Sequence, residues 1–217
     1  EIVVRGGDRI TEDAVKKLRA VQDASYGKGF LASTVGVFLF SIILFYTAYT
    51  FSARNIRKFA SSPKDILLMG VILITVLVLV RLSLFVAKSI ETAFPVMPFH
   101  LYLYLLPVAA GPMLVRLFLN SETALIFAAV ISLISGVFLE GSLGLAAYFF
   151  IGGIAAAKAV RHATQRATIT KAGLILGCIN MLVIASFIIL KGSWSLREGV
   201  FTFLFGFIGG QITSVIV

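Results

Sequence analysis

The chain has 217 residues, of which 59% are hydrophobic and only 13% are charged, and its mean hydropathy is +1.02. Soluble domains have an apolar share nearer one half, so this composition excludes a water-soluble globular domain. The net charge of +9 is explained by basic residues between apolar runs and by contact with anionic lipid, so no nucleic acid partner is expected.

Residues 1–28 are the polar part of the chain. A short strand-like stretch and a Gly-Gly turn precede a predicted helix that Thr11 caps. Val15, Leu18 and Val21 give this helix one apolar face, which nothing else in the tail could cover. We therefore expect residues 1–28 to be the end of an extracellular or periplasmic sensor domain.

Seven apolar stretches follow and predict an all-α integral membrane protein, a seven-transmembrane helix bundle over residues 29–217. A bilayer core of roughly 30 Å needs about 20 apolar residues per helix. The runs lack the alternating pattern of a membrane barrel, and helices satisfy their own backbone groups in lipid. The fourth and fifth runs are short. The predicted spans are Phe30–Phe51, Ile66–Val86, Leu101–Leu119, Thr123–Phe138, Leu145–Val160, Ile169–Leu190 and Val200–Val217.

The loop cations predict an N-terminus outside and a cytoplasmic C-terminus, because cytoplasmic loops concentrate Lys and Arg. The second loop carries Lys88, the fourth carries no basic residue, and the sixth carries Lys191 and Arg197. The first, third and fifth loops, or the helix ends beside them, carry Arg54, Arg57, Lys58, Lys64, Arg116, Lys158, Arg161, Arg166 and Lys171. Aromatic residues agree with this orientation, because they concentrate at membrane interfaces. Those near the predicted outer interface are Tyr102, Tyr104, Tyr148 and Trp194, and those near the inner one are Tyr46 and Tyr49.

Side chains that could perform chemistry are few. His100 and His162 are predicted on opposite sides of the membrane, and no HD, HExxH or paired-cysteine motif is present. We therefore expect no catalytic residue, no metal site and no cofactor in this chain. Cys178 is expected to be a small buried thiol. No carboxylate falls in the middle of a span, which argues against ion-coupled transport.

Small residues at four-residue spacing mark predicted helix contacts. Gly173 and Gly177 in the sixth span, and Gly206 and Gly210 in the seventh, allow two backbones to approach closely. Asn180 is expected to form a hydrogen bond across the same interface. These residues are candidates for helix packing and for signal transduction, and packing alone would leave the same pattern. Similar pairs are Gly152 with Ala156 and Ser132 with Gly136.

The third span contains Pro107, Gly111 and Pro112, which predict an interrupted helix. Broken helices occur in membranes where neighbours, water or a cavity satisfy the freed carbonyls. The sequence leaves open a cavity at this point or a kinked and tightly packed helix. It also leaves open whether Arg116, and Arg81 in the second span, extend to an interface or pair functionally.

Several motifs of small and apolar residues carry a family resemblance that covers essentially the whole chain. The motifs are Leu106 to Asn120, Thr123-Ala-Leu, Tyr148 to Ala156, Arg166, and Lys171-Ala-Gly-Leu with Asn180. They resemble the membrane domain of bacterial seven-transmembrane HD-hydrolase proteins, which include the PgpH-type cyclic di-AMP phosphodiesterases. The tail from Val3 to Thr11 also resembles the end of that family's extracellular domain.

The resemblance implies a sensor domain before the seven helices and a cytoplasmic HD domain with two metal ions after Val217. The His-Asp metal motifs of the family have no counterpart here. The chain itself is therefore expected to anchor the protein and transmit a signal, while the parent protein would be a metal-dependent HD-domain phosphodiesterase. The implied location is the bacterial cytoplasmic membrane. The expected partners are the lipid bilayer and the sensor and HD domains, and a homodimer is left open.

Two other functions are compatible with the sequence. One is a small-solute binding or transport subunit of the membrane, and the other is a bare structural anchor. A transducer needs a soluble domain at each end, whereas a transport subunit does not. The domains that flank the chain therefore distinguish these functions.

Overall fold

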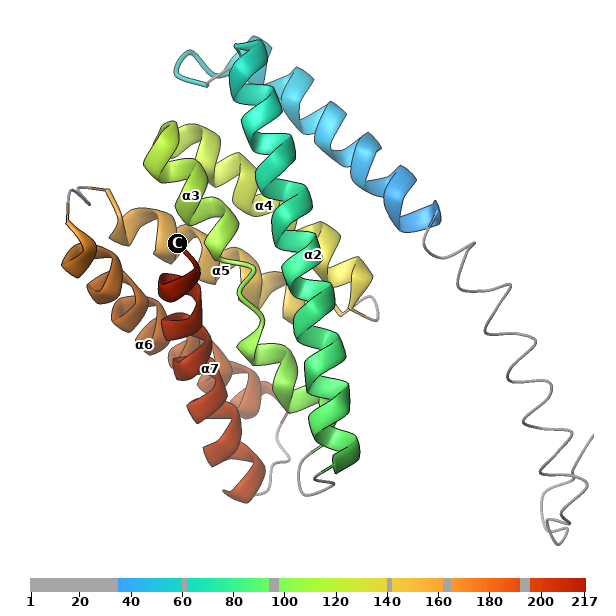
Figure 1. Ribbon diagram of the computed structural model, residues 1–217, viewed down its shortest axis with the longest axis vertical. Coiled ribbons are helices and arrows are strands. Elements are labelled where there is room, and N and C mark those ends of the chain that lie inside the picture. The colour runs from blue at the N-terminus through green and yellow to red at the C-terminus, as the bar shows by residue number, and fades with distance from the viewer. Residues whose placement is uncertain (1–34, 60–61, 94–97, 140–141, 162–164, 192–195) are drawn as a thin grey trace, which may run out of the picture. The chain divides into compact units, whose positions relative to one another are not determined.

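The computed structural model describes residues 35–59, 62–93, 98–139, 142–161, 165–191 and 196–217, and all regular structure in these ranges is helical. The sensor-domain tail predicted at residues 1–28 lies outside them. The chain divides after Ile43 into two units, and the packing described below is that of residues 44–217. The elements are a first helix, Val35–Asn55, then α2 (Pro63–Ala93), the 3-10 helix η1 (Phe99–Leu105), α3 (Ala110–Phe118), α4 (Ser121–Phe138), α5 (Leu143–Ala159), α6 (Arg166–Lys191) and α7 (Leu196–Ile216) (Figure 1).

Six helical segments in the described ranges are long and apolar enough to cross a membrane. They confirm the prediction of a helical membrane protein. The seventh segment, α5, is apolar but has only 17 residues. At about 1.5 Å per residue it rises about 26 Å, somewhat less than a bilayer core. The six segments are Val35–Asn55, Pro63–Thr92, Phe99–Phe118, Ser121–Phe138, Arg166–Leu190 and Glu198–Ile216.

α2 is longer than the sequence predicts, with 31 residues instead of the 21 expected. It begins at Pro63, because proline suits the first helical position, and the Asp65 carboxylate accepts a hydrogen bond from the Ser62 backbone N–H at 3.2 Å. At its other end the helix runs on to Ala93. Arg81 is therefore twelve residues from the end of α2, not five.

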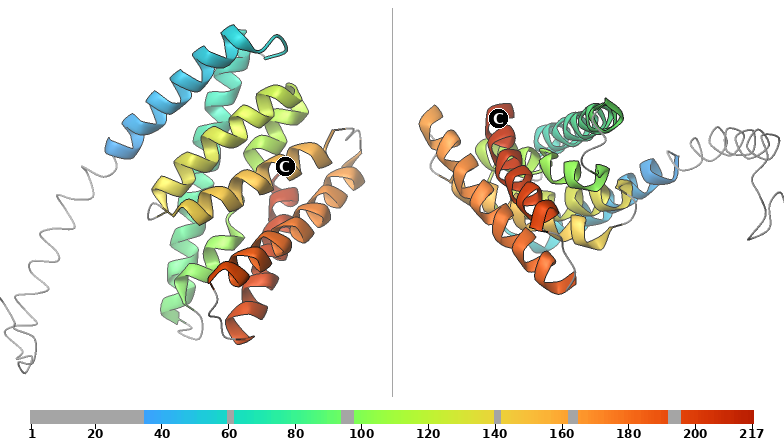
Figure 2. Two further views of the ribbon diagram at one scale, coloured as in Figure 1. Left: turned by 180° about the vertical axis from the view of Figure 1, so that it is seen from behind. Right: turned by 90° about the horizontal axis from the view of Figure 1, so that it is seen from below.

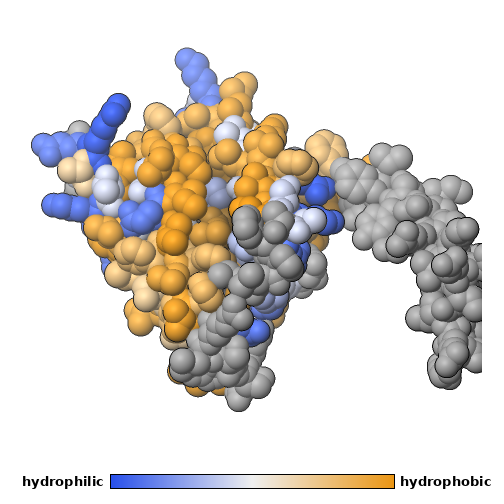
Figure 3. Space-filling view, turned by 60° about the horizontal axis from the view of Figure 1, so that its bottom comes forward, coloured by the Kyte–Doolittle hydropathy of each residue, from blue (hydrophilic) through white to orange (hydrophobic). Residues whose placement is uncertain are grey.

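Large apolar side chains cover the outer surface of α2. Leu67 is 70% exposed and Phe85 is 73% exposed, and hydrophobic residues dominate the face shown in Figure 3. An apolar patch this continuous would promote aggregation in water, but it is the ordinary surface of a helix in lipid.

α3, α4 and α5 pack closely because small residues lie where they meet (Figure 2). A Cβ added at Gly136 of α4 would lie 2.6 Å from the Cβ of Ala146 in α5. One added at Gly153 of α5 would lie 3.1 Å from Cγ of Pro112 in α3. Close approach of this kind is how membrane helices gain contact without a hydrophobic driving force.

Asn120 joins two turns at one end of this group of helices. Its Oδ1 accepts a hydrogen bond from the Thr123 backbone N–H at 2.9 Å and so caps α4. Its Nδ2 donates to the Lys58 carbonyl oxygen at 2.6 Å. The segment after the first helix is thereby tied to the start of α4.

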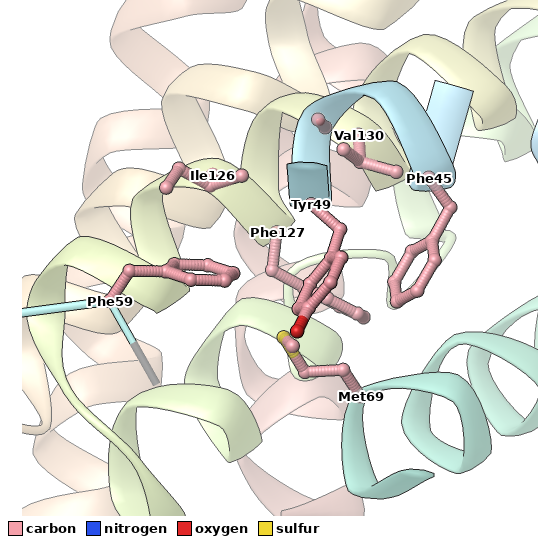
Figure 4. A pocket seen from close by; sticks show the side chains of 8 residues that line it. Phe45, Tyr49, Phe59, Met69, Ile126, Phe127 and Val130 are labelled. Carbon is pink, nitrogen blue, oxygen red and sulfur yellow. The ribbon is translucent and has the colours of Figure 1, made fainter. Parts of the chain in front are cut away.

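Beside this tie, an aromatic cluster fills the space between the first helix, α2 and α4 (Figure 4). The Tyr49 and Phe59 ring centroids are 5.8 Å apart, and Met69 and Phe127 pack against them. The remaining cavity is only about 10 Å³, which is about the smallest space that holds a water molecule. Its lining is apolar, so this is a packed joint between helices and not a binding site.

Candidate helix-packing site

α6 and α7 lie side by side in all three views (Figures 1 and 2), and they meet at glycines. A Cβ added at Gly210 of α7 would lie 2.5 Å from the backbone N of Gly177 and 2.7 Å from its Cα. It would also lie 2.8 Å from the carbonyl oxygen of Gly173. These neighbours are main-chain atoms of α6, which cannot yield unless a whole helix moves.

Gly173 and Gly177 meet α7 in a similar way. A Cβ added at Gly177 would lie 2.9 Å from the Phe207 carbonyl oxygen, and one added at Gly173 would lie 3.0 Å from the Gly210 carbonyl oxygen. Side-chain atoms are also close at these two positions, from Ser214 at Gly173 and from Phe207 at Gly177. Gly206 differs, because the nearest main-chain atom to a Cβ there would be 3.8 Å away and its nearest neighbour is Cδ1 of Ile184, the far end of a flexible side chain. The structure brings all four glycines to one interface, and three of them approach main-chain atoms of the facing helix within 3.0 Å.

Asn180 lies at the same interface and is 5% exposed. Its Nδ2 donates a hydrogen bond to the Gly206 carbonyl oxygen of α7 at 3.1 Å. On its other side, Oδ1 lies 3.2 Å from the point that a Cβ at Gly152 of α5 would occupy. Asn180 therefore sits where α5, α6 and α7 meet, and a hydrogen bond of this kind contributes about 1 kcal/mol in a membrane.

The third apolar segment is interrupted at Pro107. Residues 99–105 form the 3-10 helix η1, residues 106–109 link it to the next helix, and α3 begins at Ala110. Gly111 and Pro112 lie in the first turn of α3, where a proline is tolerated because its missing N–H would have no helical partner. Arg116 lies in the last turn of α3 and is half-buried, where its charge suits the carboxyl end of the helix.

The carbonyl groups freed by the interruption find new donors. The Tyr148 hydroxyl of α5 donates to the Tyr104 carbonyl oxygen at 3.0 Å, and the two rings meet edge to face with centroids 5.1 Å apart. The Leu106 carbonyl oxygen accepts from the Val108 N–H at 2.9 Å, and that of Pro107 accepts from the Ala110 N–H at 3.1 Å. The Tyr148 side chain and the backbone N–H groups of Val108 and Ala110 thus replace hydrogen bonds that a continuous helix would supply.

α7 also packs against this interrupted segment. A Cβ added at Gly209 would lie 2.5 Å from the Tyr104 carbonyl oxygen and 3.3 Å from Cα of Leu105. The Tyr102 and Phe205 rings, 5.2 Å apart, extend the same contact. Gly209 and its neighbour Gly210 thus put α7 against main chain on two sides, η1 and α6.

Sequence reasoning missed Gly209 and the role of Tyr148. The Gly209-Gly210 pair could have revealed the contact of Gly209, because adjacent glycines on a helix face different neighbours. No sequence pattern around Tyr148 indicates its hydrogen bond to the Tyr104 carbonyl oxygen. Tyr102 and Tyr148, which the sequence predicts near the outer interface, are both buried among helices.

Cys178 is exposed, so the prediction of a buried thiol is wrong. α6 turns Gly177 and Asn180 inward, and Cys178 falls on the outer face with Leu174 and Leu182. Arg81 is also exposed on α2, and its guanidinium lies 4.3 Å from the centroid of the Phe138 ring of α4. This is a cation–π contact between α2 and α4.

No chemical centre emerges within the part of the chain that the structure describes. No three His, Cys, Asp or Glu side chains come together there as a metal site would require. His100 lies in η1 and is exposed, and His162 falls outside the described ranges. The contacts described above are those of helix packing.

Comparisons with known proteins match this chain to a family and to a relative. The family described as the 7TM receptor with intracellular HD hydrolase matches residues 31–217. The cyclic-di-AMP phosphodiesterase PgpH of Bacillus subtilis (strain 168) is 23% identical over 230 residues, which cover 100% of this chain and 30% of that protein. The chain therefore spans less than a third of the length of this relative. No solved structure matches the chain.

The geometry predicts that two adjacent alanine substitutions differ in effect. Gly210→Ala places its methyl group against the backbone of Gly177 and should lower the free energy of unfolding by about 1–3 kcal/mol, as overpacking does. Gly206→Ala meets only the tip of Ile184 and should cost less, and Ile184→Val should relieve that cost. The measurement is the midpoint of SDS-induced unfolding.

The matched control is Gly70→Ala on α2, where nothing lies within 4 Å of the added Cβ. It should leave the midpoint unchanged or raise it, because alanine favours helix over glycine. Equal losses for Gly206→Ala and Gly210→Ala would contradict the distinction between side-chain and main-chain contact.

A second prediction concerns the hydrogen bond that spans the interruption. Tyr148→Phe removes the donor to the Tyr104 carbonyl oxygen and should cost about 1 kcal/mol in the same unfolding measurement. Tyr46→Phe removes a hydroxyl from a side chain that is 67% exposed and should cost little. If both variants unfold at the wild-type midpoint, the hydrogen bond does not support the interrupted segment.

Proposed function

The chain belongs to the family of seven-transmembrane receptors with an intracellular HD hydrolase, and we propose that it relays an extracellular signal to that hydrolase. It forms the helical membrane domain of such a receptor, since the family match covers residues 31–217 and the described helices suit a bilayer. The relay would run through α7.

The observation that carries the proposal is the placement of α7 between two main-chain contacts. Gly210 rests on the backbone of α6, and Gly209 rests on the Tyr104 carbonyl of η1. Side chains can change rotamer and absorb a small displacement, but main-chain contacts cannot. A shift of α6 or η1 would therefore displace α7 as a rigid element, as helix shifts do in known switches.

The interrupted third segment supplies a second element that could move. η1 and α3 are joined by a four-residue link, so the direction of their axes is not fixed by one continuous helix. η1 touches α2 as well as α7, and α2 also touches α3. A signal that displaces α2 would thus reach α7 through η1, while the contacts of α3 with α4 and α5 would oppose the movement of α3.

We also propose seven spans, with the N-terminus outside and the C-terminus in the cytoplasm. The supporting observation is that the basic residues concentrate in the first, third and fifth connections. The description of the family as receptors with an intracellular hydrolase agrees with a cytoplasmic C-terminus. In this arrangement the short helix α5 crosses the membrane, and the bilayer would thin slightly around it.

The catalytic activity would belong to the parent protein. By analogy with the cyclic-di-AMP phosphodiesterase relative, we propose that a cytoplasmic HD domain with two metal ions cleaves a cyclic dinucleotide. The proposed location of the protein is the bacterial cytoplasmic membrane. The partners of the present chain would then be lipid, a sensor domain on the outside and the hydrolase within.

The orientation can be tested by cysteine labelling of intact cells. With Cys178→Ser as the background, His100→Cys should react with a membrane-impermeant maleimide, and Ser62→Cys should react only after the cells are permeabilised. Both positions are exposed and lie in different connections. Labelling of Ser62→Cys alone in intact cells would reverse the topology and remove the basis for a relay into the cytoplasm.

The relay can be tested in the full-length protein by measuring cyclic di-AMP hydrolysis. Gly209→Ala should separate α7 from η1 and change the rate several-fold, or remove its dependence on the extracellular domain, while Gly70→Ala should do neither. The isolated 217-residue chain should show no hydrolysis. Normal regulation in a well-folded Gly209→Ala protein would leave the membrane domain as an anchor.

A further inference from the structure

An apolar cleft of about 270 Å³ opens between α2, η1 and α7. α2 forms one wall with six residues between Leu79 and Ile90, including Ser83 and Ala87. Tyr102 of η1 and Ile212 of α7 belong to the opposite side. The cleft is therefore lined by α2 on one side and by η1 and α7 on the other.

The cleft is long and narrow. Its lining on α2 recurs every three or four residues from Leu79 to Ile90, which places it along one stripe of the helix for about 16 Å. A cleft of about 270 Å³ is several times smaller than the volume of an α-helix about 10 Å across over the same length. Its size therefore suits an extended hydrocarbon chain and not a second transmembrane helix.

The chemistry of the walls favours hydrocarbon. Ser83 and Tyr102 bring the only polar side chains among the ten residues that line the cleft, and the other eight are apolar. The outer rim is continuous with the lipid-facing surface of α2, because Leu82 is 57% exposed and Val86 is 53% exposed. The hydrocarbon of the bilayer thus has direct access to the cleft.

We propose that this cleft holds one acyl chain of a membrane phospholipid, which lies along α2 and contacts η1 and α7. The inference goes beyond the proposed function, because a relay through α7 requires no lipid site. An acyl chain in this position would touch both Tyr102 and Ile212, so it would brace the contact between η1 and α7 from the membrane side.

The test is retention of phospholipid by the full-length protein, purified in dodecyl maltoside from membranes that contain phosphatidylglycerol and measured by native mass spectrometry. Ala87→Phe fills the cleft from its α2 wall and should remove one tightly held phospholipid per chain. Ser83→Leu is a smaller filling variant and should lower the occupancy as well. Val78→Phe, on the exposed face of α2 outside the cleft, should retain the lipid at the wild-type level.

Circular dichroism and gel filtration establish that each variant is folded, and Ser83→Leu keeps the test valid if Ala87→Phe is not. Loss of lipid from the filling variants alone supports the site. The same number of retained phospholipids in all variants shows ordinary surface lipid and overturns the proposal. Loss of lipid from Val78→Phe together with the others overturns it too.

Discussion

The hydrocarbon interior of a membrane offers no hydrogen bonds to the backbone, and the arrangement of helices in this protein depends on that constraint. A continuous helix meets it by itself, but the third segment is interrupted at Pro107, and its carbonyl groups need partners from elsewhere. Tyr148 supplies one from α5, and the tight link itself supplies others. The hydroxyl that α5 brings to the break thus stabilises it and joins α5 to η1.

Glycine has the corresponding role between helices. Lipid tails are as apolar as leucine, so membrane helices associate through close packing and not through burial of apolar area. α7 achieves this on two sides, with Gly210 against α6 and Gly209 against η1. Asn180 then adds a hydrogen bond to the Gly206 carbonyl oxygen of α7. Polar and steric complementarity thus converge on the same turns of α7.

Much of this could be predicted from the sequence, since hydropathy and small-residue spacing are local signals. The helices begin and end within a few residues of the predicted spans, except that α2 continues to Ala93. Four glycines meet at the interface of α6 and α7, namely Gly173, Gly177, Gly206 and Gly210. Their spacing predicts a close helix contact but not which atoms each glycine faces. What could not be predicted depends on pairs of distant residues: the bond from Tyr148 to Tyr104 joins positions 44 residues apart, and no local pattern carries it. The exposed position of Cys178 likewise depends on which face of α6 meets its neighbours.

The apolar segments differ in how much of their surface is packed against other helices. In the most apolar part of each segment, 67% of residues are buried in Phe99–Phe118 but only 28% in α2. α2 therefore has fewer contacts to break when it shifts, and the apolar cleft lies along it, between this loosely held helix and α7. α3, α4 and α5 interlock through Gly136 and Gly153 and resist such a shift. α2 contacts both η1 and α3, and η1 in turn contacts Gly209 of α7, so a continuous set of contacts joins this loosely held helix to α7.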